Sequence, residues 1–293
     1  MWSLLVAVAS VALSQDTDTT FAVRQGQRLE VSDFGGEVVI KAWRQNSVRV
    51  RATHSSRERV LISTDGATIS INGSSRHGPA MVDYEILAPA WIPLSVSGTP
   101  SAEVRIEGTE AEVTVETVEG SVYVVGGRGN ISLHTVEGEV SLANASGHIE
   151  LNSVDGSIEL KESSGDVRAE TVDGTITLLD IESADVDAST VDGTIEYDGT
   201  IKDGGRYRFQ SHDGDVTVSI PERANVTVSV ATFSGDFDSA FPITLKDKTR
   251  HRFNFTLGSG SARLELESFG GSIGLRRPGQ VHDQGNENQN YEE

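Results

Sequence analysis

Apolar residues recur along this chain with a spacing of nine residues. Every ninth position from Val104 to Ile176 is β-branched, and the residue two places after each of them is apolar as well. The residue in between is polar at nearly every step. This alternation predicts a short strand with its apolar side chains turned inward and a polar one turned outward. We therefore expect short strands joined by tight turns, and almost no helix.

The turns between these strands are of two kinds. Every second turn is a valine, an acid and a glycine, and the turns between them are less regular. The Val-acid-Gly turns stand at residues 118–120, 136–138, 154–156, 172–174 and 191–193. One repeat is therefore two strands and two unlike turns in about 18 residues, a period typical of solenoids.

An antiparallel meander is the alternative, because Asp-Gly is a strong hairpin signal. Hairpin register would place Ile131 opposite Asn144 and Val167 opposite Asp180. A solenoid instead stacks Ile131, Ile149 and Val167 in one column, so that like residues meet. We therefore predict an all-β, single-domain parallel β-solenoid (β-helix) with two short strands per coil, in which the corner valine is also buried.

The chain divides into a leader, one elongated domain and a tail. The apolar run from Leu4 to Leu13, followed by small residues, predicts a signal peptide cleaved after Ser14. The proline-containing segment 81–100 is expected to interrupt or cover the coils. The predicted parts are a signal peptide (1–14), a β-solenoid (21–277) made of irregular coils (21–101), regular repeats (102–240) and capping coils (241–277), and a disordered tail (278–293).

Charge narrows the range of partners. The chain has 24 basic and 44 acidic residues, which gives a net charge of -20. This charge repels nucleic acid and anionic membrane surfaces. With no cysteine, the chain has no disulfide and no thiolate site. We expect no stable membrane span, and an exported protein that is periplasmic, on the cell surface or secreted.

The acids of the Val-acid-Gly turns are the first candidate site. In a solenoid they form a column along one corner, each followed by a turn glycine that permits positive φ. Turn chemistry explains this pattern, and a loose calcium ladder is the alternative, although the calcium β-roll signature is absent. We expect no cofactor. The acids are Glu119, Glu137, Asp155, Asp173 and Asp192, with Asp213 of the His-Asp-Gly turn that follows, and the turn glycines are Gly120, Gly138, Gly156, Gly174, Gly193 and Gly214.

Catalytic candidates are few. His134 and His148 are placed by the repeat on adjacent corners, but without the serine and carboxylate of a triad. Asp236 and Asp238 suggest two-carboxylate glycoside chemistry, yet nothing in the sequence fixes their separation. The outward faces show no aromatic ladder for stacking sugars. We therefore expect a protein that is not an enzyme, with a polysaccharide-active β-helix enzyme as the alternative.

Three segments together resemble a known family. The block RLEVSDFGGEVVIKAW, the segment VDYEILAPAWIPLSV and the repeats TVEGEV and TVDGTITL are similar to the bacterial putative-adhesin domain, a β-strand-repeat family of unknown function. The resemblance covers about residues 21–277 and implies a right-handed solenoid on an exported or envelope protein. We therefore expect an adhesin-like interaction surface whose partner is an unidentified envelope or extracellular protein or polysaccharide, with a calcium-modulated structural β-roll as a further alternative.

Overall fold

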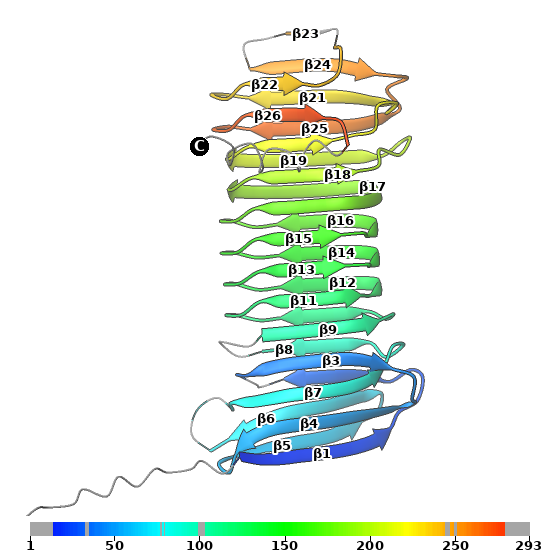
Figure 1. The fold of residues 1–293 in the computed structure, drawn as a ribbon, viewed down its shortest axis with the longest axis vertical. Helices are drawn as coiled ribbons and strands as arrows, with labels where there is room; N and C mark the ends of the chain where they lie inside the picture. Colours follow the sequence, from blue (N-terminus) through cyan, green and yellow to red (C-terminus); the bar gives the residue numbers. More distant parts are fainter. Residues whose placement is uncertain are drawn as a thin grey trace, which may run out of the picture.

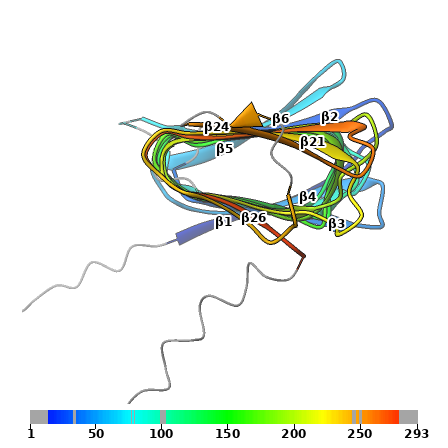
Figure 2. The same ribbon diagram turned by 90° about the horizontal axis from the view of Figure 1, so that it is seen from above.

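The computed structural model describes residues 14–32, 35–76, 78, 80–98, 103–243, 247–248 and 251–278. Within these ranges every regular element is a β-strand, and the strands stack into one long column (Figure 1). Viewed along its length, the column is a flattened ring with two facing walls (Figure 2). The all-β prediction is confirmed. Most of the predicted leader and tail lies outside the described residues, and the described part contains no helix that could cross a membrane.

The two walls are called face A and face B here, and their strands are given in spatial order along the column. Face A consists of β1 (Ser14–Ala22), β4 (Ser47–Ser55), β7 (Val82–Pro89), β3 (Glu37–Trp43), β9 (Glu103–Thr109), β11 (Val122–Gly126), β13 (Val140–Ala143), β15 (Ile158–Lys161), the first part of β17 (Ile176–Asp192), β18 (Ile195–Gly199), β20 (Val216–Ser219), β26 (Ile273–Arg276) and β22 (Phe237–Ser239). Face B consists of β5 (Glu58–Asp65), β6 (Thr68–Ser75), β2 (Arg28–Ser32), β8 (Leu94–Ser97), β10 (Val113–Glu116), β12 (Arg128–His134), β14 (Ser146–Asn152), β16 (Ser164–Glu170), the second part of β17, β19 (Arg206–Asp213), β25 (Ala262–Ser268), β21 (Val226–Thr232), β24 (Arg252–Leu257) and β23 (Asp247–Lys248).

Neighbouring strands in the middle of the column run parallel, in the register that the repeat predicts. Ile131 pairs with Ile149, and Ile149 pairs with Val167 in the next coil. All three side chains are buried. Burial of one such side chain contributes roughly 1.5–3 kcal/mol, so a coil gains its stability by covering the apolar residues of its neighbours.

Both ends of the column depart from the parallel pattern. At one end β4 runs antiparallel to β1 and β7, and β5 runs antiparallel to β6. At the other end β24 runs antiparallel to β21 and to β23. Antiparallel pairs need only short connections, so hairpins can close the ends where a further full coil would leave another open edge.

The spatial order of the coils also departs from the order of the chain. The coil of β2 and β3 lies between the coil of β6 and β7 and that of β8 and β9. The coil of β25 and β26 lies between the coil of β19 and β20 and that of β21 and β22. Residues 262–276 are therefore inserted within the column and do not cap it. The segment 81–100 does not interrupt the column either, because β7 and β8 are regular members of it.

The corner valine points outward, which corrects the expectation that it is buried. Val172, for example, is 48% exposed, while the threonine before it, Thr171, is buried. The Thr171 hydroxyl donates a hydrogen bond of 3.0 Å to the carbonyl oxygen of Gly156 in the preceding coil. The inward corner position therefore suits a hydroxyl that satisfies a buried carbonyl, which valine lacks.

Candidate functional site

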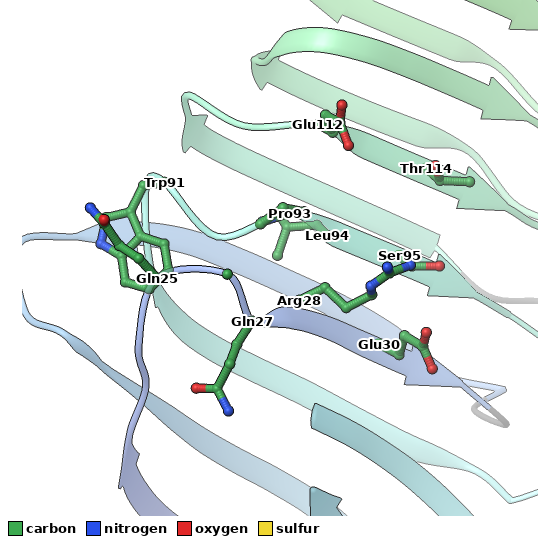
Figure 3. A pocket seen from close by; sticks show the side chains of 11 residues that line it. Gln25, Gln27, Arg28, Glu30, Trp91, Pro93, Leu94, Ser95, Glu112 and Thr114 are labelled. Carbon is green, nitrogen blue, oxygen red and sulfur yellow. The ribbon is translucent and has the colours of Figure 1, made fainter. Parts of the chain in front are cut away.

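A groove on face B is the candidate ligand site, and we call it the Trp91 groove. It has a volume of about 510 Å³ and lies over β2, β8 and the start of β10. This volume falls within the range of about 300–1,000 Å³ that is usual for small-molecule sites. Figure 3 shows its side chains, which are those of Gln25, Gln27, Arg28, Glu30, Trp91, Pro93, Leu94, Ser95, Glu112 and Thr114, with Gly26 completing the wall.

Trp91 lies in the turn between β7 and β8, and the surrounding backbone holds this turn firmly. The Ile92 N–H donates to the carbonyl of Pro89 at 3.2 Å, and the Glu110 N–H donates to the carbonyl of Ala90 at 2.8 Å. The indole N–H donates to Oδ1 of Asn46 at 3.3 Å. The ring is half-buried against the core. Trp91 is therefore fixed in place while part of its surface remains exposed.

A tight turn at residues 24–27 forms the neighbouring wall. The backbone N–H of Arg24 donates to Oε1 of Gln27 at 2.9 Å, and the backbone N–H of Gln27 donates to the Arg24 carbonyl oxygen at 3.2 Å. Gly26 allows this turn because its φ is 86°, a value that favours glycine. Gln25 is exposed and lies with Trp91 at one end of the groove (Figure 3).

The floor consists of outward positions on three adjacent parallel strands. Glu30 pairs in register with Ser95, and Ser95 pairs with Thr114. Arg28 lies two residues before Glu30 on the same outward side of β2, as strand alternation requires. In Figure 3 the side chain of Arg28 extends along the floor toward Ser95, and Glu30 and Glu112 lie on either side of it.

The charged side chains of this groove are not engaged with one another. Among the residues that the structure describes, none forms an ion pair or a side-chain hydrogen bond with Arg28, Glu30 or Glu112. An indole surface beside free donors and acceptors suits a ligand that has both an apolar face and several hydroxyl or amide groups.

A second hollow on face A is different because ion pairs occupy it. The guanidinium of Arg51 lies 3.3 Å from the carboxylate of Glu85. The guanidinium of Arg49 donates two hydrogen bonds to Asp18, and this interaction lowers the pKa of Asp18 to about 2. These side chains stabilise the contact of β1 with β4 and β7, so this hollow is a structural feature.

The predicted column of acids is present in the structure, but it is formed by backbone pairing and its side chains point into solvent. Each of these acids pairs through its backbone with the acid of the next coil, and all their side chains are exposed. Within the described ranges, no group of three or more metal-ligating side chains lies close enough to hold a cation. The column consists of Glu119, Glu137, Asp155, Asp173, Asp192 and Asp213.

The turn glycines make close backbone contacts between coils. A Cβ placed on Gly156 would lie 2.0 Å from the carbonyl oxygen of Gly138, and one on Gly174 would lie 2.4 Å from that of Gly156. Gly193 and Gly214 repeat this contact at 2.1 Å. Glycine is thus required because successive backbones touch at this corner, a reason that adds to its conformational freedom.

The other predicted candidates do not come together as a catalytic site. His134 lies at the end of β12, and His148 lies near the start of β14 beside Asn130, so the two histidines are at opposite ends of neighbouring strands. Asp238 forms an ion pair with Arg276 at 2.7 Å. These residues therefore show neither a nucleophile with its base nor a free pair of carboxylates.

An aromatic ladder that the sequence analysis did not foresee lies on one corner of the column and not on an outward face. The rings of His212, Phe269, Phe233 and His251 stack in this order along the Val-acid-Gly corner, with centroid distances of 5.0, 4.7 and 4.8 Å. The inserted coil places Phe269 between His212 and Phe233, which linear spacing does not reveal. Both faces of each phenylalanine ring are covered by neighbouring rings, so this ladder stabilises the corner and leaves no phenylalanine face for a sugar.

Sequence reasoning missed the residues of the Trp91 groove. The available signal was Trp91 itself, an aromatic residue between Pro89 and Pro93 in a segment expected to interrupt or cover the coils. Arg28 and Glu112 are 84 positions apart in the chain (112 minus 28), and they share a groove because the coil of β2 and β3 is inserted next to β8.

Comparison with protein families gives a match over residues 26–276, to the model described as Toastrack DUF4097. The chain belongs to this Toastrack family. The predicted resemblance to a bacterial adhesin-like family of unknown function is thereby confirmed. No curated protein matches the chain.

Solved structures with the same fold support this assignment. A putative adhesin from Parabacteroides distasonis is 11% identical, with a TM-score of 0.52 over 89% of this chain and 97% of that one. A putative adhesin from Parabacteroides merdae is 9% identical, with a TM-score of 0.53 over 89% of this chain and 96% of that one. At such low identity, the likeness establishes the Toastrack fold alone.

Proposed function

We propose that this Toastrack protein is a non-enzymatic, exported, adhesin-like module. It is a right-handed solenoid that presents an extended interaction surface in the bacterial envelope or outside it. The names of the two Parabacteroides neighbours support an adhesive role, and the predicted leader supports export. Its partner is an envelope or extracellular protein or polysaccharide.

One observation carries the proposal: a fixed scaffold presents charged side chains that it does not itself engage. The buried columns and the backbone contacts at the glycine corner determine the position of every outward residue. In the Trp91 groove, Arg28, Glu30 and Glu112 are held on this scaffold without an ion-pair partner among the described residues. Pre-organised groups of this kind lower the entropic cost of binding.

The test is retention of the purified full chain on isolated peptidoglycan, envelope polysaccharide and host-type cell surfaces. We expect saturable retention on at least one of them, with no turnover of the bound material. Retention on none would contradict the proposal, and release of shortened polysaccharide would favour an enzyme. Cell fractionation combined with external protease tests the export, because an exported chain leaves the cytoplasmic fraction.

A further inference from the structure

We infer that the Trp91 groove binds a neutral oligosaccharide, with one sugar ring stacked on the indole of Trp91. This inference rests on the proposed function and names the ligand class of its surface. It depends on three features of the groove: a fixed and partly exposed indole, polar groups spaced along a shallow floor, and a negative local charge.

The indole provides the stacking surface. A pyranose ring has an apolar face of C–H groups, and burying that face on an aromatic ring removes both surfaces from water. Trp91 is held by its N–H bond to Asn46 and by the backbone bonds of its turn, so stacking requires little further ordering. The His–Phe ladder cannot take this role, because both faces of Phe233 and Phe269 are covered.

The polar side chains match the hydroxyl groups around a sugar. The carboxylates of Glu30 and Glu112 accept hydrogen bonds from hydroxyls, and the guanidinium of Arg28 donates to them. Ser95 and Thr114 both donate and accept, and they lie on neighbouring strands about 4.8 Å apart. These groups extend from Trp91 along face B (Figure 3), so the groove suits a short chain of sugar rings.

Charge selects a neutral sugar over an anionic one. The groove has one cation, Arg28, and two anions, Glu30 and Glu112, which gives it a local charge of -1 (one minus two). The whole chain, including these residues, carries a net charge of -20. Uronates, sulfated glycans and phosphates are therefore repelled by the groove and by the overall field.

Three variants of the full chain test the inference by affinity electrophoresis through neutral polysaccharides and by titration with gluco-, galacto-, manno- and N-acetylhexosamine oligosaccharides. We expect Trp91→Ala to weaken binding about tenfold or more, as is typical of a buried aromatic anchor, and Trp91→Phe to retain part of it. Tyr123→Ala is the matched control, because Tyr123 is also a half-buried aromatic residue with its polar group bonded, to Oε2 of Glu139 at 3.2 Å, but lies on face A outside the groove. It should bind as the native chain does.

Fluorescence reports directly on the groove. The chain has three tryptophans, so the double variant Trp2→Phe/Trp43→Phe leaves Trp91 as the sole indole. A bound neutral sugar should shift the emission of Trp91 to shorter wavelength and protect it from iodide. An unchanged spectrum with every sugar overturns the inference, as does equal binding by Trp91→Ala and Tyr123→Ala. Trp91-dependent binding of an anionic glycan or a peptide instead also overturns it, while the proposed function stands. Only a failure of the chain to be retained on any surface would contradict both the inference and the proposed function.

Discussion

Replacing a corner glycine tests the claim that backbone contacts hold the coils together. In Gly156→Ala the new Cβ would lie 2.0 Å from the carbonyl oxygen of Gly138, 2.6 Å from its carbon and 3.1 Å from the hydroxyl of Ser153. Carbon–oxygen contacts in proteins are rarely shorter than about 3.3 Å. The clashing atoms of Gly138 belong to the backbone, so no side-chain rotation relieves the clash. The two coils must therefore separate by more than about 1 Å.

The hydrogen bonds at this corner determine how much stability Gly156→Ala should lose. The Asp155 N–H donates to the carbonyl of Val136 at 2.8 Å, and the Gly138 N–H donates to that of Asp155 at 3.0 Å. The Ser153 hydroxyl donates to the Gly138 carbonyl at 3.2 Å. Losing these three at about 1 kcal/mol each, together with some packing between the apolar columns, predicts a loss of about 3–5 kcal/mol in the free energy of unfolding.

Gly204→Ala is the control because it separates the clash from the backbone strain. Gly204 has a φ of 76°, but a Cβ there would meet no atom within 4 Å. Its replacement should cost only about 1–2 kcal/mol for the left-handed backbone. Urea unfolding of both variants and the native chain, followed by circular dichroism, gives the comparison. If Gly156→Ala were no less stable than Gly204→Ala, the proposed contact between coils would be refuted.

Three further predictions concern other parts of the column. Thr171→Val keeps the volume but removes the hydrogen bond to Gly156, so urea unfolding should show a loss of about 1–2 kcal/mol, and an unchanged midpoint would contradict this role. Asp173→Asn relieves repulsion between stacked acids and should stabilise the chain by up to about 1 kcal/mol at low salt. That gain should disappear in 1 M salt, about the level at which the screening length falls to roughly 3 Å, and a salt-independent gain would argue against electrostatics. Because Arg49 lowers the pKa of Asp18 to about 2, the ion pair stabilises the fold above about pH 4 and is lost as the pH falls toward 2. Asp18→Asn should flatten this acid dependence in thermal unfolding, and an unchanged acid limb would exclude the pair as its cause.

The regular part of the fold was predictable because equivalent positions in each repeat carry the same type of residue. Ile131, Ile149 and Val167 stack in the register that their spacing predicts, since any other pairing buries a polar residue. The corner valine was assigned wrongly because periodicity alone does not show which residue of a turn faces inward. The buried carbonyl of Gly156 decides this, and it requires the hydroxyl of Thr171.

The Trp91 groove could not be predicted from the sequence, for a topological reason. Its residues come from three neighbouring strands of face B, and β2 lies beside β8 although the two are not in consecutive coils of the chain, as the pairing of Leu29 with Leu94 shows. Nine-residue spacing predicts contacts only between consecutive coils. The same limitation concealed the aromatic ladder, because Phe269 follows Phe233 in the chain but precedes it in the column.

The two inserted coils nevertheless share a sequence. Residues 28–36 read RLEVSDFGG and residues 263–271 read RLELESFGG, and both coils lie between two others on each face. Apart from β22, which is parallel to β26, the outermost strands are instead antiparallel, which leaves less regular edges for another chain to extend. Because each inserted coil is covered on both sides, it cannot fray without breaking two sets of strand pairs. The column thereby ends in antiparallel strands, except at β22, and is held from within by the chain's first and last full coils, so its surface groups keep fixed positions.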